Sequence, residues 1–434
     1  YRNAIALRRT LPVLAKGDFE PFASGPDVLG VWRWSGSERV CVLANRSLGE
    51  ARTVRVPMAD ADEVSDVVSG SAPHVERGQA EVFLWPLGTA VLHFHDRVRL
   101  QRPLEPGMGV LCHVTSVPNG GRPGTLGAPG RRFVDWLASA GQRYWQVLPV
   151  NPADGFGSPY AGLAAFAGDT GLLERPCGEV LEELHDIGND PDYQEFCENN
   201  EYWLRPYCTF CALKELHGGA AWQDWPAADR RFSPAMAHDP RLTETAERAR
   251  RLQFEFDREW RDLVDYAHGR GVMVIGDMPM FVSADSADVW SEPDVFDLGD
   301  DGRPARMAGA PGDAFAPEGQ LWGNPTYRWD VLRERGYDWW LRRLGRAMAL
   351  YDYVRLDHFI GFSSYYAIPA GGTPADGAYA YGPGAELFEA AHAQFGPLPF
   401  VAEDLGMVTP AVRALVAQTG IPGMDVVQFS DGDV

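Results

Sequence analysis

Short apolar runs bounded by turn residues recur in the second part of the chain, from residue 108 onward. Six of them predict buried parallel strands, because a strand covered on both faces is apolar along most of its length. They are GVLCHVTS (109–116), YWQVLPVNP (144–152), VMVIGDMP (272–279), YVRLDHF (353–359), FVAEDLG (400–406) and MDVVQFS (424–430). Helical patterns lie between the runs, and one of them places Leu252, Phe256 and Trp260 on one face.

Strands that alternate with helices predict an α/β fold. We expect a (β/α)8 TIM-type barrel over residues 108–434, with about six of its eight strands in this chain. About 120 residues separate the second and third predicted strands, far more than one crossover needs. A largely helical subdomain is therefore expected as an insertion at about 158–248.

Residues 1–98 follow a different pattern, in which short β-type runs are separated by turn residues. The runs are VLGVWRW (28–34), VCVLAN (40–45), RTVRV (52–56), AEVFLWP (80–86) and TAVLHFH (89–95). Their spacing predicts a small all-β sandwich, preceded by the end of a helix. A segment with charged residues and prolines, 99–107, is expected to link this sandwich to the barrel.

Two of the predicted strands each end at a carboxylate, Asp357 in one and Glu403 in the other. In a parallel barrel such positions open into the ring of βα loops, where catalytic groups lie. Arg355 is two residues before Asp357 and points the same way, and its guanidinium favours the ionised carboxylate that a nucleophile requires. A structural ion pair explains this motif equally well. The apolar residues before Glu403 suggest an acid that keeps its proton, with Asp404 as the alternative.

Further polar residues lie near these strand ends. Asp277 ends its strand and is expected either to bind a sugar hydroxyl or to cap the next turn. The segment 313–330 and the SPY triplet at 158–160 combine hydrogen-bonding groups with aromatic rings, as polyol sites do, although packing also accounts for the rings. The candidate side chains there are Tyr160, Asp313, Gln320, Trp322 and Asn324. His113 and His358 also end strands, where a structural hydrogen bond is their more common role.

Composition narrows the possible partners. Lys plus Arg total 39 and Asp plus Glu total 60, a net charge of −21, so neither nucleic acid nor an anionic lipid surface is an expected partner. No apolar run approaches the ~20 residues that span a bilayer. No cluster of metal ligands is evident in the sequence, and we expect no metal and no cofactor. Cys208 and Cys211 are expected to pack on one helix face rather than to act in redox chemistry.

Seven motifs occur in a fixed order along the chain. They are GVLCHVTSVP, YWQVLPVNP, SPYAGLAAFAGD, GDMPMFVSADSADVW, DAFAPEGQLWGNPTYRWD, VRLDHFIGF and VAEDLG. Together they resemble the 4-α-glucanotransferases of glycoside hydrolase family 77, the amylomaltases or disproportionating enzymes, from about residue 108 to the last residue. The resemblance implies a (β/α)8 barrel and retaining transfer of α-1,4-glucan segments between donor and acceptor malto-oligosaccharides. It also implies a cytoplasmic enzyme of starch or glycogen metabolism that needs no cofactor.

On this resemblance Asp357 is the nucleophile, Glu403 the general acid and base, and Arg355 the partner of the nucleophile. The residues that it places around the donor and acceptor subsites are Tyr160, Asp277, Asp313, Gln320, Trp322, Asn324 and His358. Residues 1–98 resemble instead the C-terminal β-sandwich of α-amylase-type enzymes, which suggests an amylase catalytic domain fused upstream. An α-glucan hydrolase and a non-catalytic carbohydrate-binding protein are the alternative hypotheses.

The chain also departs from the family pattern. Ile360 stands where the family has Arg, Tyr379 where it has Trp, and Ala164 and Asp169 where it has Ser and Asn. The third catalytic carboxylate of the family lies in a His-Asp-Asn motif on the seventh strand, and this chain has no such motif. We therefore expect the chain to be part of a longer protein and to be inactive alone.

Overall fold

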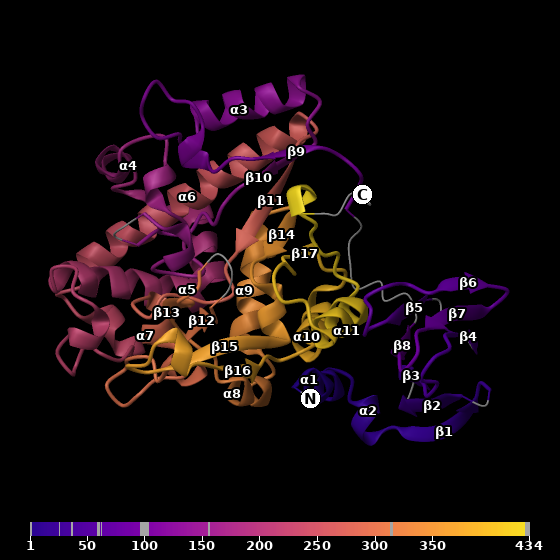
Figure 1. Cartoon of the computed structure of the whole chain (residues 1–434). Helices are drawn as coiled ribbons and strands as arrows, with labels where there is room; N and C mark the ends of the chain where they lie inside the picture. Colours follow the sequence, from indigo (N-terminus) through magenta and orange to yellow (C-terminus); the bar gives the residue numbers. More distant parts are fainter. Residues whose placement is uncertain are drawn as a thin grey trace. The chain divides into compact units, whose positions relative to one another are not determined.

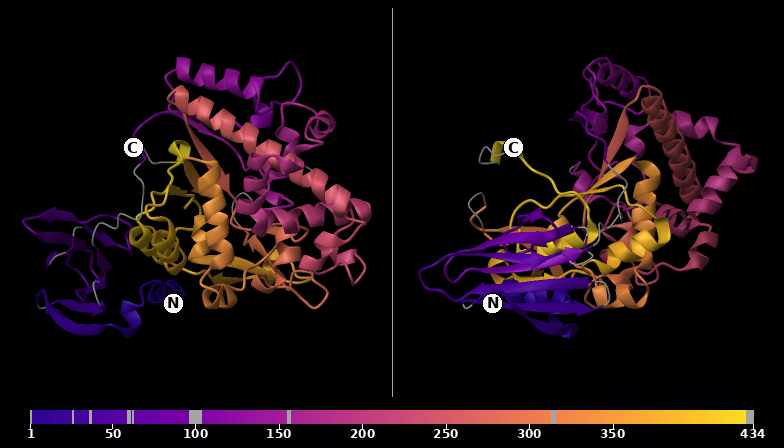
Figure 2. Two further views of the ribbon diagram at one scale, coloured as in Figure 1. Left: turned by 180° about the vertical axis from the view of Figure 1, so that it is seen from behind. Right: turned by 90° about the vertical axis from the view of Figure 1, so that its right-hand side faces the viewer.

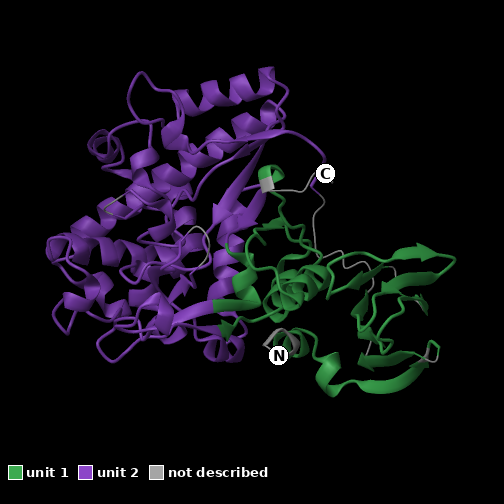
Figure 3. Ribbon diagram, viewed as in Figure 1, with its two compact units in different colours: residues 1–103, 358–365, 380–434 green, residues 104–357, 366–379 purple. Residues whose placement is uncertain are grey.

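The computed structural model describes residues 2–25, 27–35, 38–58, 61, 63–95, 104–154, 157–312 and 316–429. The chain forms two compact units, which are coloured separately in Figure 3. Unit 1 consists of residues 1–103, 358–365 and 380–434, and unit 2 consists of residues 104–357 and 366–379. Both units contain residues predicted to carry the chemistry.

Two antiparallel sheets form the N-terminal part of unit 1 (Figure 1). Their strands are β1 (Asp18–Ala23), β2 (Val28–Ser35), β3 (Glu38–Asn45), β4 (Arg52–Pro57), β5 (Glu63–Asp66), β6 (His74–Glu76), β7 (Gln79–Leu84) and β8 (Thr89–His95). The larger sheet has the order β1-β2-β3-β8-β5 and the smaller sheet the order β4-β7-β6. The five predicted runs are confirmed as β2, β3, β4, β7 and β8. The sequence analysis missed β1, β5 and β6, which lack a clear apolar alternation.

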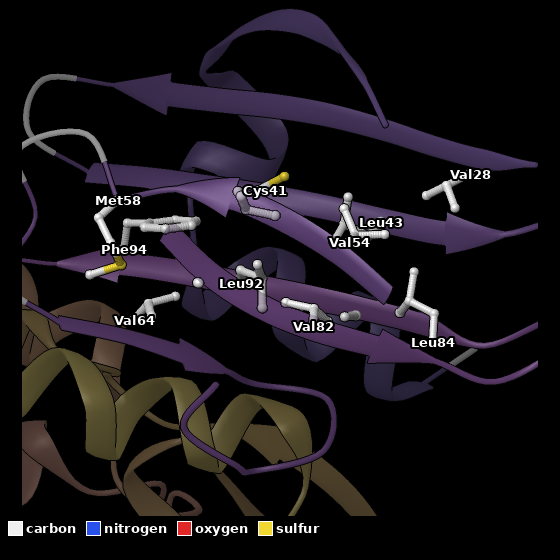
Figure 4. Packing of buried hydrophobic residues seen from close by; sticks show 13 residues of the cluster. Val28, Cys41, Leu43, Val54, Met58, Val64, Val82, Leu84, Leu92 and Phe94 are labelled. Carbon is white, nitrogen blue, oxygen red and sulfur yellow. The ribbon is translucent and has the colours of Figure 1, made fainter. Parts of the chain in front are cut away.

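The two sheets share one hydrophobic core (Figure 4). Val82 and Leu84 of β7 point into it, opposite residues of the larger sheet such as Leu43 and Leu92. Burial of an aliphatic side chain of this size contributes about 1.5–3 kcal/mol relative to exposure. Side chains alternate between the two faces of a strand, so Phe83 lies on the outer face of the small sheet.

Segments from both ends of the chain pack together in unit 1. They are α1 (Arg2–Thr10), α2 (Val13–Lys16), the 3-10 helix Phe359–Phe362, α10 (Glu386–Phe395), β17 (Phe400–Ala402) and α11 (Pro410–Thr419). Ala414 of α11 belongs to the same buried cluster as Leu11 and Val91. The guanidinium of Arg413 donates a hydrogen bond to the carbonyl oxygen of Val68 at 2.8 Å. The N-terminal sheets therefore share a core with the helix that follows Glu403.

Unit 2 contains four parallel strands in the order β9-β10-β11-β14. They are β9 (Gly109–Leu111), β10 (Tyr144–Gln146), β11 (Met273–Met278) and β14 (Tyr353–Leu356). The helices between them include α3 (Ala128–Ser139), α6 (Thr243–Gly269) and α9 (Asp338–Leu350), and α3 lies beside α6 (Figure 2). This alternation confirms the predicted α/β class with a parallel sheet.

The predicted insertion, 158–248, is described throughout and contains no strand. It holds α4 (Cys177–Glu183), α5 (Pro191–Leu216), several 3-10 helices and the start of α6. Helix α5 begins where the side chain of Asp190 accepts hydrogen bonds from the backbone N–H groups of Asp192 and Tyr193, as an N-cap does. Cys208 is fully buried in α5, and burial raises the pKa of Cys211 to about 11, so this pair packs as predicted.

A second, antiparallel sheet in unit 2 was not predicted. Strand β12 (Arg306–Ala310) pairs with β13 (Gln320–Pro325) on one side and with β15 (Ser364–Pro369) on the other. The remaining elements of this region are α7 (Ala287–Ser291), α8 (Trp329–Glu334) and β16 (Ala378–Tyr381). The sequences RMAGA and QLWGNP contain glycine and proline, which are depleted in strands, so they gave no strand signal.

The sixth predicted strand, MDVVQFS (424–430), is wrong. Residues 421–426 are irregular and Val427–Phe429 form a 3-10 helix. Val427 is exposed, and an apolar run becomes a buried strand only where neighbouring strands satisfy its backbone hydrogen bonds. Ser430 and residues 99–103 of the predicted linker lie outside the described residues.

Candidate active site

Polar residues of unit 2 lie at the carboxyl ends of two adjacent strands. Asp277 on β11 and Arg355 on β14 are partners in the parallel register. Asp357 follows β14 directly, and its backbone N–H donates to the carbonyl oxygen of Met278 at 3.0 Å. Because residues two apart on a strand share a face, Arg355 and Asp357 point to the same side, as predicted.

Arg355 joins two carboxylates. Its Nη1 donates to Oδ1 of Asp277 at 2.7 Å and to Oδ1 of Asp357 at 2.8 Å. Tyr160 donates its hydroxyl to the other oxygen of Asp277, Oδ2, at 2.7 Å. Three predicted residues, Tyr160, Asp277 and Arg355, are thus linked to Asp357 in one hydrogen-bonded chain.

The two carboxylates differ in their exposure. Asp277 is 3% exposed and both of its oxygens are hydrogen-bonded, whereas the side chain of Asp357 is 28% exposed. Among the described residues, Oδ2 of Asp357 has no hydrogen-bond donor. Asp357 therefore presents a free carboxylate oxygen, while Arg355 and Tyr160 each occupy one oxygen of Asp277.

Burial and neighbouring charge set the protonation of this cluster. Burial raises the pKa of Asp277 and Asp357 adds to this, while Arg355 and Tyr160 oppose it. Burial alone would lower the pKa of Arg355, but the two carboxylates outweigh that cost and the net pKa is raised. The pKa of Tyr160 is raised by burial and then by Asp277. Arg355 therefore stays charged and Tyr160 stays a hydrogen-bond donor at neutral pH.

Glu403 lies in unit 1, directly after β17. Its Oε2 accepts a hydrogen bond from the backbone N–H of His358 at 2.8 Å, and its Oε1 accepts one from the N–H of Leu405 at 3.2 Å. The N–H of Phe359 also donates to the carbonyl oxygen of Glu403 at 2.9 Å. The half-buried side chain is thus held by backbone donors, and the apolar setting expected for this carboxylate stays a prediction.

His358 has the left-handed backbone conformation, with φ 51° and ψ 44°. This turn aims its N–H at Glu403, a role that the sequence analysis missed because every residue except proline carries the same donor. Asp404, the alternative acid, lies elsewhere: its Oδ1 accepts a hydrogen bond from the N–H of Met424 at 2.9 Å. Asp404 therefore binds the backbone of the 421–426 segment.

The predicted aromatic loop contributes strand β13. The indole N–H of Trp322 donates to Oε1 of Gln320 at 2.9 Å, and Trp322 is 38% exposed. Asn324 donates from Nδ2 to the carbonyl oxygen of Val282 at 2.8 Å. Asp313 lies outside the described residues.

The remaining predictions concern metals and membranes. Among the described residues no group of three or more His, Cys, Asp or Glu side chains is placed to hold a metal ion. No described helix has the length and apolar character to cross a bilayer.

His113 is the other histidine that ends a predicted strand. Burial lowers its pKa, and a hydrogen bond with the backbone of Leu148 opposes this shift. A structural role is therefore the simpler interpretation of His113.

A family model and two curated relatives with the same named activity match most of this chain. The sequence profile of 4-alpha-glucanotransferase matches residues 112–185 and 177–433. The 4-alpha-glucanotransferase of Thermus thermophilus is 39% identical over 368 residues, covering 76% of this chain and 74% of that protein. The enzyme of Streptococcus pneumoniae serotype 4 is 37% identical over 363 residues, covering 74% and 72%.

Two solved amylomaltases are also similar to this chain. The amylomaltase from Streptococcus agalactiae in complex with acarbose is 34% identical with a TM-score of 0.69, covering 76% of this chain and 75% of that chain. The amylomaltase from Corynebacterium glutamicum is 18% identical with a TM-score of 0.61, a likeness of fold that covers 92% of this chain and 65% of that chain. The chain belongs to the 4-α-glucanotransferase family, whose members transfer α-1,4-glucan segments between glucans.

Proposed function

We propose that Asp357 is the nucleophile and Glu403 the general acid and base of retaining glucan transfer. Glu403 gives its proton to the glycosidic oxygen while a carboxylate oxygen of Asp357 bonds to the anomeric carbon, and the leaving glucan departs as an alcohol. An acceptor hydroxyl then gives its proton to Glu403, and its oxygen displaces Asp357. The α configuration is retained because the anomeric carbon is inverted twice.

The bridge from Arg355 to Asp357 carries this proposal. The guanidinium holds Oδ1 of Asp357 at 2.8 Å, which orients the carboxylate and leaves Oδ2 for attack on the sugar. Asp277 lies on the far side of Arg355 at 2.7 Å and holds the guanidinium in place. An ion pair with a purely structural role would not require that Asp357 keep one carboxylate oxygen free and partly exposed. This feature supports the role of nucleophile.

We further propose donors and acceptors of the malto-oligosaccharide type, since the Streptococcus agalactiae relative was solved with acarbose. The side chains assigned to their subsites are Tyr160, Asp277, Asp313, Gln320, Trp322, Asn324 and His358. Tyr160 and Trp322 are both partly exposed and offer rings to sugar faces. The hydrogen-bonding groups of Gln320 and Asn324 lie on the same strand as Trp322.

Two further proposals concern the architecture of the protein, and one concerns its location in the cell. The parallel strands β9, β10, β11 and β14 belong to a (β/α)8 barrel that begins at about residue 108. The N-terminal sheets correspond to an α-amylase-type C-terminal sandwich over residues 1–98, on the sequence resemblance. The Corynebacterium glutamicum structure covers 92% of this chain, more than residues 108–434 make up, so the likeness of fold extends to residues before 108. The enzyme acts in the cytoplasm.

Trapping the covalent intermediate tests the assignment of both carboxylates. The Glu403→Gln variant of the protein expressed from its complete gene is incubated with maltotriosyl fluoride, whose leaving group needs no protonation. The glycosyl-enzyme should then accumulate, and peptide mass spectrometry should locate the added sugar on Asp357. An adduct on another carboxylate would exclude Asp357 as the nucleophile.

A further inference from the structure

Two large aromatic side chains are exposed together at one end of strand β7. Phe83 is 55% exposed and Trp85 is 70% exposed. Their ring centroids lie 5.0 Å apart at an interplanar angle of 88°. Adjacent exposed rings of this size are uncommon on a protein surface unless something binds them.

The alternation of side chains along β7 explains their direction. Val82 and Leu84 point into the core of the two sheets (Figure 4), so Phe83 and then Trp85 face outward. Polar groups share the outer face of the small sheet. Thr53 on β4 is the cross-strand partner of Phe83, and the next pair on this face is Arg55 and Glu81, which form an ion pair at 3.2 Å.

The backbone that carries Trp85 is firmly held. The buried side chain of Asn45 donates from Nδ2 to the carbonyl oxygens of Trp85 at 3.0 Å and of Leu84 at 3.3 Å. The N–H of Gly88 donates to the same oxygen of Trp85 at 2.8 Å and closes a turn. In that turn Leu87 is exposed with φ 58°, a conformation that costs a leucine energy. The ring of Trp85 therefore projects from an ordered turn rather than from a loose loop.

We propose that the outer face of the sheet β4-β7-β6 is a second binding site for α-1,4-glucan chains, with Phe83 and Trp85 as its stacking platform. Aromatic faces pack on the apolar faces of pyranose rings. Thr53, Arg55 and Glu81 supply donors and acceptors for sugar hydroxyls beside the rings. The indole N–H of Trp85, which has no acceptor among the described residues, supplies a further donor.

A neutral polymer suits this face better than a charged one. The protein carries a net charge of −21, which repels polyanions, and Arg55 and Glu81 neutralise each other on the face itself. The choice of an α-1,4-glucan rests on the glucanotransferase function, since that polymer is the substrate. The site shares no residue with the candidate active site. Holding a long glucan there raises its local concentration for the enzyme, an advantage that a short oligosaccharide does not have.

The test compares three variants of the protein expressed from its complete gene. Native gel electrophoresis with amylose in the gel measures retardation, with dextran as the polymer control. The double variant Phe83→Ala, Trp85→Ala should raise the apparent Kd for amylose about tenfold, as loss of aromatic contacts predicts. Trp85→Tyr keeps a ring and should keep most of the binding. Phe19→Ala removes an exposed ring from the larger sheet and should leave binding unchanged.

Disproportionation of maltotriose is measured for every variant and should stay at the wild-type rate. If the wild type does not disproportionate maltotriose, the proposed function is contradicted. If amylose retards the double variant as much as the wild type, only the second binding site is overturned. Sedimentation supplies the other decisive outcome. If the double variant dissociates a dimer while amylose retardation is unchanged, the face is a protein interface and not a glucan site.

Discussion

Oε2 of Glu403 accepts a hydrogen bond from the backbone N–H of His358 at 2.8 Å. His358 follows Asp357 in the chain, so the residue that holds the proposed acid is the sequence neighbour of the proposed nucleophile. A second backbone donor, the N–H of Leu405, holds the other oxygen at 3.2 Å. Every substitution at position 358 except proline keeps the first of these donors.

Glu403→Gln should slow transfer from maltotriose far more than transfer from an activated glucosyl fluoride. The fluoride leaves without a proton, and general acid help is worth roughly 10²–10⁴-fold. Steady-state rates on both donors measure the ratio. Equal losses on the two donors would assign the acid role to another residue.

Asp357→Asn should reduce transfer by several orders of magnitude with little effect on stability, because the shape of the side chain is kept while its nucleophilic charge is lost. The matched control is Asp404→Asn, since Asp404 binds the N–H of Met424 at 2.9 Å and has no proposed role in the chemistry. Thermal melts and maltotriose assays are run on both. An Asp357→Asn enzyme within tenfold of the wild type would contradict its role as nucleophile.

Trp322→Ala should raise the KM for the acceptor glucan and increase the share of hydrolysis. The exposed ring is a stacking surface worth ~1 kcal/mol that also keeps water from the reacting carbon. The control is Leu321→Ala, because Leu321 is exposed on the same strand and points to its other face. The ratio of transfer products to free glucose, followed by chromatography, decides the outcome. A ratio unchanged from wild type would give Trp322 a packing role only.

The strand-borne part of the site was predictable from the sequence. Arg355 and Asp357 are two apart on an apolar run, and period-two alternation alone places them on one side. The identity of Asp277 as the second partner of Arg355 was not predictable, because the pairing depends on the register between β11 and β14. The sequence analysis expected Asp277 only to bind a sugar hydroxyl or to cap the next turn.

Features that depend on backbone direction or on distant partners were missed. The left-handed turn at His358 has no sequence signal, since histidine does not require that conformation. The run 424–430 has the composition of a buried strand, yet composition does not reveal whether neighbouring strands are present to pair with it. Strands β12 and β13 were missed for the opposite reason, because RMAGA and QLWGNP pair without a strand-like composition.

The pH dependence of stability should change in Asp288→Asn. Asp288 is buried in the first turn of α7, where its Oδ2 accepts a hydrogen bond from the N–H of Ala165 at 2.7 Å. Burial raises its pKa to about 6, opposed by that hydrogen bond and by Arg343. The ordinary value in an unfolded chain is about 3.9. Asparagine keeps an oxygen for Ala165 but cannot ionise.

The direction of this change in stability follows from the number of protons that the folded and unfolded states bind. Between pH ~4 and ~6 the folded wild type holds a proton that the unfolded chain has released, so its free energy of unfolding falls as pH rises through this window, by ~3 kcal/mol in all. The Asp288→Asn variant lacks this loss of stability. Its free energy of unfolding relative to that of the wild type should therefore increase between pH ~4 and ~6 and stay constant above pH ~6. Urea unfolding at several pH values measures the difference, with the exposed Asp330→Asn as control. Parallel pH curves for Asp288→Asn and wild type would show that Asp288 does not titrate in this range.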